Sequence, residues 1–373
     1  MDLELSDTQR VLRDRARGYA ARALAPFAAD FERRQAVPRE VLAEMAQMGL
    51  MAVNVPAELG GAGAGAVAYA CAMREVARGC AATAVTMAVT NMVGEVIVRF
   101  GTDAQRARHV TRLASGEHAA GAFALSEPEA GSDPGAMRTT ASRDGEGWVI
   151  RGAKQWISSG PLAGVFVVWA RTGGAGTSGI SCFLVEGGAP GLKIGRHEDK
   201  MGLRASATVP LEFDDVRVPA DALLGVEGGG FRIAMMALDG GRVGIASQAV
   251  GIATAALEAG LDAVARGEVR GEAQRRALAD ARCELEAAWL LALRAAWLKE
   301  QGRPFSQEAS VAKLYASETA WRVTNQVVSA LGPAGCRRAP SVERHLRDSR
   351  VTMIYEGTSE IQRLVIARGL LKG

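Results

Sequence analysis

Val165-Phe-Val-Val-Trp169 decides the fold, because it is a clear β-prone run in a chain whose two ends carry helical patterns. Short runs of the same kind lie on both sides of it, at Trp148–Ile150, Ser181–Val185, Leu192–Ile194 and Val209–Phe213. Gly-rich turns such as Asp144–Gly147 and Thr172–Gly176 separate these runs. Short strands joined by such turns predict a small antiparallel barrel or sandwich.

Helix start signals and helical periodicity flank this segment. Ser6-Asp-Thr-Gln9 and Thr102-Asp-Ala-Gln105 are capping boxes that begin helices. Longer helices are predicted over residues 65–79 and 81–100 on the N-terminal side, and over 231–266, 272–301 and 306–331 on the C-terminal side. The last three are rich in Ala and Leu, which suits an antiparallel bundle.

Segregated strands between two helical blocks favour separate domains over a parallel α/β fold. The 373 residues and 48% apolar content are enough for two or three such domains. We therefore predict an α+β multidomain protein. Its parts are an N-terminal helical domain (1–118), a middle antiparallel β-barrel or sandwich domain (119–228) and a C-terminal domain resembling a four-helix bundle (229–373).

Composition excludes several classes of function. The net charge is only +3, without basic blocks, so nucleic-acid binding is not expected. We also expect no membrane insertion, because no apolar run approaches the roughly 20 residues that span a bilayer. The helix that begins near Ser6 leaves no room for a leader peptide. The five scattered cysteines predict small core residues in a reducing cytoplasm, and the four histidines lack metal-ligand spacing.

Glu356 is the candidate catalytic residue. It follows the apolar run Met353–Tyr355 and precedes Gly357, so its carboxyl group is predicted to lie where water is scarce. Burial disfavours the charged form and raises proton affinity, as a general base near neutral pH requires. The plainer alternative is that Glu356 ends a loop before a helix opening at Thr358 or Ser359.

Two further stretches could contact a ligand. Phe123-Ala-Leu-Ser-Glu-Pro-Glu-Ala-Gly-Ser-Asp133 offers a corner of small residues where backbone N–H groups can approach a ligand closely. Lys154-Gln-Trp-Ile-Ser-Ser-Gly160 places an indole and a hydroxyl on one strand face, suited to a planar ring and its polar edge. Each stretch alone also fits an ordinary turn or a core strand.

These stretches together resemble the acyl-CoA dehydrogenase family. They occur in that family's order, with three more matching segments at Lys200–Ser206, Phe213–Pro219 and Leu238–Gly244. The resemblance covers nearly the whole chain. It implies an FAD-dependent oxidoreductase of fatty acid metabolism that converts an acyl-CoA to its trans-2-enoyl-CoA. It also implies an electron-transfer flavoprotein as acceptor and a homodimer or homotetramer as the assembly.

The resemblance also assigns residues. Glu356 matches the family's base; some members carry that glutamate on a helix where this chain has Gly241. In relatives the base removes a proton from the carbon next to the thioester carbonyl, which gives an enolate. A backbone N–H of the base and a hydroxyl group of FAD stabilise this enolate. The implied cofactor-binding residues are Phe123, Leu125, Ser126, Gly131, Ser132, Trp156, Ile157, Ser158, Thr358 and Glu360. The implied substrate-binding residues are Ser132, Asp239, Arg242, Tyr355 and Gly357.

Two segments depart from the family's pattern. Residues 260–280 lack the R-x-x-F-G segment of relatives, and Ser329 and Pro333 stand where a Gln and a Gly are usual. Proline removes a backbone donor, so we predict a weaker grip on the ADP half of FAD. Two alternatives remain open. One is a flavin oxidase, or a dehydrogenase acting on a carrier-protein thioester; the other is a degenerate member without FAD that serves as a scaffold.

Overall fold

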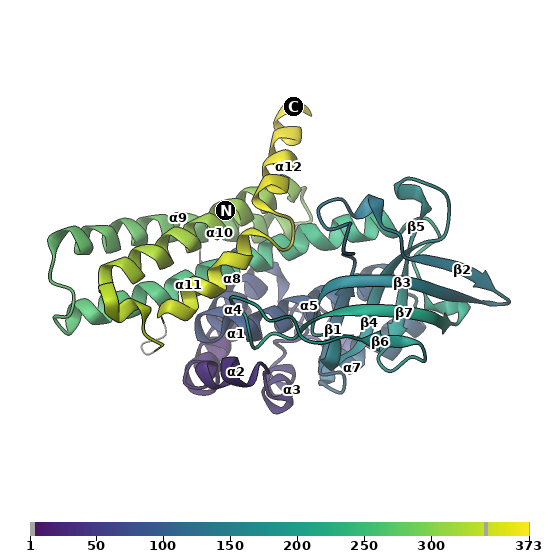
Figure 1. Ribbon diagram of the computed structural model, residues 1–373, viewed down its shortest axis with the longest axis horizontal. Helices are drawn as coiled ribbons and strands as arrows, with labels where there is room; N and C mark the ends of the chain where they lie inside the picture. The colour runs from purple at the N-terminus through teal and green to yellow at the C-terminus, as the bar shows by residue number, and fades with distance from the viewer. Residues whose placement is uncertain (1–3, 339–341, 373) are drawn as a thin grey trace.

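A computed structural model describes residues 4–338 and 342–372. Figure 1 shows a helical N-terminal part, a β-sheet part and a C-terminal bundle of long helices. The predicted fold class is therefore confirmed, with the β-sheet part at one end of an elongated molecule and the long helices at the other.

The N-terminal part consists of short helices around two longer ones. Its α-helices are α1 (Asp7–Tyr19), α2 (Ala28–Arg34), α3 (Arg39–Gln47), α4 (Gly65–Gly79), α5 (Ala81–Phe100), α6 (Asp103–Gln105) and α7 (Thr111–Ser115). Both predicted capping boxes form, at Ser6 and Thr102. The predicted bounds of α4 and α5 are confirmed.

The middle part is one eight-stranded sheet in the order β6-β7-β3-β2-β4-β5-β8, with β1 beside β4. Its strands are β1 (Ala120–Ala124), β2 (Thr140–Asp144), β3 (Gly147–Ser158), β4 (Ala163–Arg171), β5 (Ile180–Glu186), β6 (Leu192–Ile194), β7 (Thr208–Val218) and β8 (Leu223–Leu224). The five predicted runs all lie within strands. Most strand pairs are antiparallel, as predicted, but β4 runs parallel to β1 and, at one residue pair, to β2.

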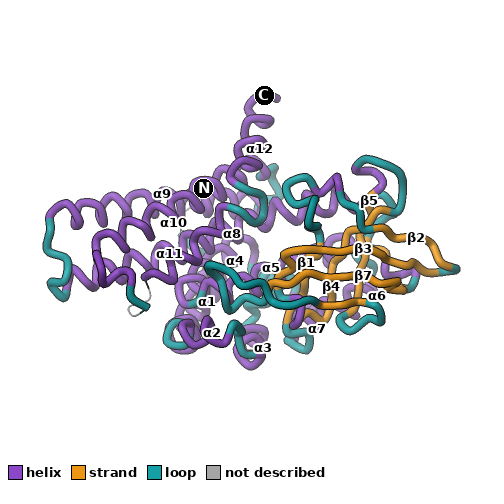
Figure 2. Tube along the Cα trace, viewed as in Figure 1, coloured by secondary structure: helices purple, strands orange, loops and turns teal. Residues whose placement is uncertain are grey.

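The C-terminal part contains α8 (Gly230–Ala265), α9 (Glu272–Glu300), α10 (Ser306–Leu331), α11 (Val342–Arg350) and α12 (Ser359–Lys372). The three long helices begin and end within one residue of their predicted bounds. They pack through small residues such as Ala253, Ala288 and Ala316, which permit close approach. Figure 2 shows α12 projecting from the body of the molecule.

Two helices correct the expectation about apolar runs. By length and composition, α5 and α8 could each cross a membrane. Their most apolar windows are 89% and 83% buried within the protein, which is typical of core helices. Their apolar character is thus explained by packing.

The cysteine prediction was only partly right. Cys71, Cys80 and Cys182 are buried as expected, but Cys283 and Cys336 are exposed. Cys283 lies on the outer face of α9, and Cys336 lies in the turn that follows α10.

Candidate active site

Glu356 lies in a tight loop between a 3₁₀ turn (Val351–Met353) and α12. Its φ is 53° and that of Gly357 is 89°, so two consecutive residues are left-handed. This region is unfavourable for a residue with a side chain, and strained residues of this kind cluster at functional sites. Thr358 caps α12 by accepting a hydrogen bond from the Ile361 N–H (3.3 Å), as the alternative reading of this stretch also expected.

The Glu356 carboxyl group packs against a glycine of α8. Its Oε2 atom is buried and has no hydrogen-bond partner within residues 4–338 and 342–372. A Cβ atom at Gly241 would lie only 2.5 Å from this oxygen. Because Gly241 has no side chain, it leaves the space that the carboxyl group occupies. Positions 241 and 356, which the sequence analysis named as the two places where family members carry the base, therefore face each other.

The electrostatic environment of Glu356 favours a proton. Burial raises its pKa to about 7, although Arg242 and Lys313 oppose the shift. A carboxyl group with such a pKa can accept a proton at neutral pH and later release it. This matches the property predicted from the apolar run before Glu356.

Two residues that the sequence analysis did not select hold the loop. Lys313 of α10 donates from Nζ to the Gly357 carbonyl oxygen (2.6 Å). Gln362 of α12 donates from Nε2 to the carbonyl oxygens of Glu356 (3.1 Å) and Gly357 (2.9 Å). A lysine inside an Ala-rich helical pattern was the available signal for Lys313, but nothing local connected it to position 357.

The predicted substrate-binding residues Asp239 and Arg242 lie on α8 on either side of Gly241, and Tyr355 lies in the loop itself. Arg242 is buried and donates to Asp239 Oδ1 (2.6 Å) and to Ser310 Oγ (3.2 Å). The Tyr355 hydroxyl group donates to Gln248 Oε1. These contacts place the three predicted residues with Glu356 and Gly357 in one site formed by α8, α10 and the loop before α12.

Trp156 forms part of a second group of predicted residues, on β3. Its φ is 63°, and the register of β3 against β7 shifts between Lys154 and Ile157, which indicates a β-bulge. The bulge leaves the indole 60% exposed, while Ser158 is half-buried. An exposed indole held on a strand is suited to stack on a planar ring.

A hydrogen bond joins Trp156's strand to the predicted small-residue corner, because the Gln155 N–H donates to the Ser126 carbonyl oxygen (2.9 Å). Beneath them, Lys154 Nζ donates to Glu127 Oε1 (2.8 Å) and to the Leu125 carbonyl oxygen (3.1 Å). Both Lys154 and Glu127 are buried. The structure therefore fixes the corner and the strand as one unit.

Some predicted cofactor-binding residues have side chains that point into the hydrophobic core. Ile157 is 1% exposed and Leu125 6% exposed, and both belong to the hydrophobic core. Phe123 packs on Trp169, with ring centroids 4.3 Å apart. These residues could meet a cofactor mainly through their backbone or one edge. In contrast, Gly131, Ser132 and Glu360 are exposed.

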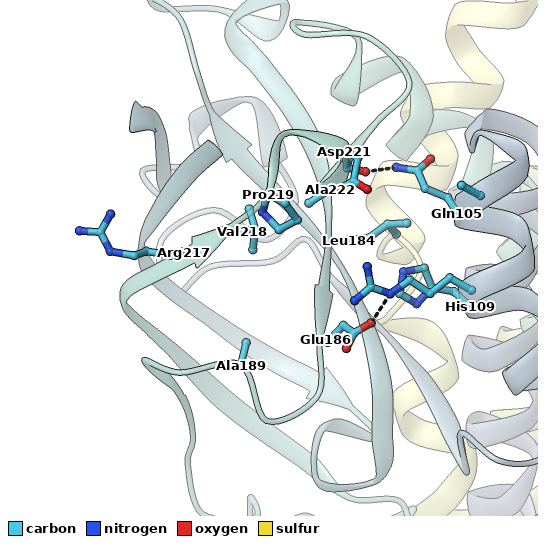
Figure 3. Close-up of a pocket in the computed structure, with 12 residues that line it drawn as sticks. Gln105, His109, Leu184, Glu186, Ala189, Arg217, Val218, Pro219, Asp221 and Ala222 are labelled. Atoms are coloured by element: carbon cyan, nitrogen blue, oxygen red, sulfur yellow. Dashed lines mark hydrogen bonds and ion pairs between the residues drawn. The ribbon is translucent and has the colours of Figure 1, made fainter. Parts of the chain in front are cut away.

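A separate cavity of about 230 Å³ is shown in Figure 3. It is formed by the turn of π-helix at Arg106–Val110 together with β5, β7 and the residues that follow β7. Inside it, Arg108 Nε pairs with Glu186 Oε1 at 2.7 Å. None of the predicted site residues lines this cavity.

Comparison with known proteins identifies the family. The N-terminal, middle and C-terminal domain models of acyl-CoA dehydrogenases match residues 6–117, 122–216 and 228–371. The chain therefore belongs to the acyl-CoA dehydrogenase family, and it is an oxidoreductase.

Individual relatives are similar over most or all of their length. The mitochondrial short-chain specific acyl-CoA dehydrogenase of Bos taurus is 47% identical over 99% of this chain and 92% of its own. The solved structure of butyryl-CoA dehydrogenase from Megasphaera elsdenii superimposes with a TM-score of 0.95 at 37% identity and full coverage of both chains. A chain from a structure described as the electron transferring flavoprotein of Acidaminococcus fermentans gives 0.98 at 37% identity, also with full coverage.

Proposed function

We propose that this protein oxidises short-chain acyl-CoA thioesters to trans-2-enoyl-CoA products, with Glu356 as the catalytic base. The observation that carries the proposal is the Oε2 atom of Glu356, which is buried beside Gly241 and has no hydrogen-bond partner in the described part of the chain. A structural carboxylate would have a partner at this depth, because an unpaired buried charge is unfavourable. A carboxylate without a partner can accept a proton from a substrate.

Removal of a proton next to a thioester carbonyl also needs stabilisation of the developing enolate. The Glu356 N–H donates no hydrogen bond to any other described residue. The carbonyl oxygens of Glu356 and Gly357 are both engaged by Gln362. The N–H of the base is thus free to donate to the thioester oxygen, as a pre-aimed donor should be.

The residues of β3 and its neighbouring corner fit FAD. The exposed indole of Trp156 suits one face of the flavin ring, and the half-buried Ser158 offers a hydroxyl group to its edge. Ser359 at the start of α12 is buried, and its Oγ atom has no partner among the described residues, which suits an acceptor group of a ligand. When bound, FAD supplies the redox chemistry by accepting hydride from the substrate's β carbon.

The substrate class and the electron acceptor follow from the relatives. Both the Bos taurus enzyme and the Megasphaera elsdenii enzyme carry short-chain names, which supports a short acyl chain. The similarity to a chain from the Acidaminococcus fermentans structure supports an electron-transferring flavoprotein as the partner.

The assembly and compartment are also part of the proposal. Leu364, Leu370 and Leu371 on α12 are 51%, 69% and 87% exposed, and the helix projects from the body in Figure 1, which supports a homodimer or homotetramer that covers it. Five cysteines without a disulfide among the described residues support a reducing cytoplasm.

The test is the visible absorption spectrum of the purified protein with FAD, without oxygen, before and after addition of acyl-CoAs of increasing length. We expect a flavin spectrum that is bleached by butyryl-CoA and less by long acyl-CoAs. A flavin that no acyl-CoA bleaches would contradict the proposed function. A protein that does not retain FAD would favour the scaffold alternative.

A further inference from the structure

Lys313 lies in the N-terminal half of α10 and is completely buried. Its Nζ atom pairs with no carboxylate within residues 4–338 and 342–372. Instead, it donates to the carbonyl oxygen of Gly357 (2.6 Å). Burial lowers the pKa of Lys313 to about 7, although the nearby Glu356 opposes the shift. An amino group is seldom placed at this depth without a specific role.

The carbonyl that Lys313 contacts belongs to the strained loop. Glu356 and Gly357 are both left-handed, and such conformations persist only when the surroundings hold them. Lys313 holds the loop from α10, whereas Gln362 holds the same carbonyl oxygen from α12 (2.9 Å). The loop that carries the base is therefore held by hydrogen bonds from two helices, α10 and α12, that are separate in the sequence.

The titratable groups around Glu356 come from several elements. Arg242 faces it from α8, Lys313 from α10, Tyr69 from α4 and Tyr355 from its own loop. Arg242 is already engaged by Asp239 and Ser310. Among the residues that the structure describes, Lys313 is thus the cation that both faces the carboxyl group and donates a hydrogen bond to the loop that carries it.

We propose that Lys313 is a positioning residue for the base. Its hydrogen bond to Gly357 keeps Glu356 in the left-handed conformation that aims the carboxyl group, and its charge favours the ionised carboxylate. This inference rests on the proposed function and adds to it a residue that does not touch substrate.

The experiment compares Lys313→Met with wild type in steady-state kinetics over a pH series, using the FAD-loaded enzyme and butyryl-CoA. We expect kcat to fall about 10-fold to 100-fold, since small misplacements of a catalytic group have effects of this size, while KM changes by less than about threefold. The acid limb of kcat/KM should move to higher pH, because a carboxylate that loses a neighbouring cation is harder to ionise.

Two further variants separate the roles. Gln362→Met removes the other donor to the Gly357 carbonyl without changing charge, so it should lower kcat and leave the acid limb in place. Lys299→Met is the matched control: Lys299 pairs with Glu95 (2.5 Å), and its loss should change neither kcat nor the limb. If Lys313→Met does not fold, Lys313→Gln is measured in the same way.

A Lys313 variant with wild-type kcat and an unmoved acid limb would overturn the inference. So would a Lys299 variant with the same changes, because the effect would then be general destabilisation. A wild-type enzyme that no acyl-CoA reduces would instead contradict the proposed function itself, so the two failures are distinguishable.

Discussion

Glu356 and Glu127 are both glutamates withdrawn from water near a buried lysine, yet the protein treats them in opposite ways. Glu127 receives hydrogen bonds from Lys154 Nζ (2.8 Å) and from two backbone N–H groups. Glu356 leaves Oε2 without a partner among the residues described, and Lys313 donates to a backbone carbonyl instead. The carboxylate of Glu127 is thus occupied by structural hydrogen bonds, whereas the carboxylate of Glu356 is left able to accept a proton.

The two pKa values diverge accordingly. Burial alone would raise the pKa of Glu127, but Lys154 and the backbone donors outweigh it and hold the pKa below its usual value. For Glu356 burial prevails, and the pKa rises to about 7 against the opposing charges of Arg242 and Lys313. Hydrogen bonding, more than depth, thus decides whether a buried carboxyl group is structural or reactive.

Replacement of the unpaired carboxylate should have the largest effect. We expect Glu356→Gln to lower kcat by about 10³-fold to 10⁴-fold while FAD and acyl-CoA still bind, because the change removes the base and little shape. Single-turnover flavin reduction measures the loss. Retained turnover in this variant would show that another group takes the proton.

Replacement of the lysine at the paired carboxylate should instead affect folding. Lys154→Met leaves Glu127 buried without its cation, so the free energy of unfolding should fall by about 3–5 kcal/mol. Chemical denaturation measures it. The double variant Lys154→Met/Glu127→Gln should recover part of the loss, and no recovery would argue against a charge penalty.

A smaller change tests the space beside Glu356. A Cβ atom at Gly241 would lie 2.5 Å from Glu356 Oε2, so Gly241→Ala should displace the carboxyl group and lower kcat roughly 10-fold to 100-fold. Gly240→Ala is the matched control, because its Cβ would meet only the flexible end of Lys299 at 3.1 Å. Equal kcat values in the two variants would contradict the packing described for the base.

The smallest expected effect is on the pH dependence of stability. The folded-state pKa of Glu127 is lowered, so its contribution to the free energy of unfolding is present at neutral pH and is lost as the pH falls. The pKa of Glu356 is raised, so as the pH rises toward 7 its carboxyl group ionises more readily in the unfolded state than in the folded state, and stability is lost. Glu356→Gln should therefore be relatively more stable than wild type at pH 8 than at pH 5, measured by thermal unfolding.

Much of this architecture could be predicted from sequence because its signals are local. Capping boxes marked the starts of α1 and α6, and helical periodicity gave the bounds of helices such as α5 and α10. The apolar run before Glu356 indicated a carboxyl group with raised proton affinity. Strands β1 and β2 were missed, since one consists mostly of small residues and the other is largely polar. Their pairing with β4 depends on contacts across the chain.

The supporting residues of the site could not be predicted for the same reason. Lys313 meets Gly357 only after α10 and the loop before α12 are brought together. The bulge that exposes Trp156 and the burial of Ile157 depend on the register of β3 against β7. The weaker grip on the ADP half of FAD, predicted from Ser329 and Pro333, stays a prediction for an FAD dissociation constant to test.

The central claim is that Glu356, whose Oε2 atom is buried without a hydrogen-bond partner among the described residues, is the base. The most direct test of it is the pH profile of kcat/KM for butyryl-CoA. This parameter reports the pKa of the free enzyme's essential base. The structure predicts an acid limb with an apparent pKa near 7, below which activity falls about tenfold per pH unit. A profile that stays flat down to pH 5 would mean that Glu356 titrates like an ordinary glutamate, or is not the base, and would contradict the account.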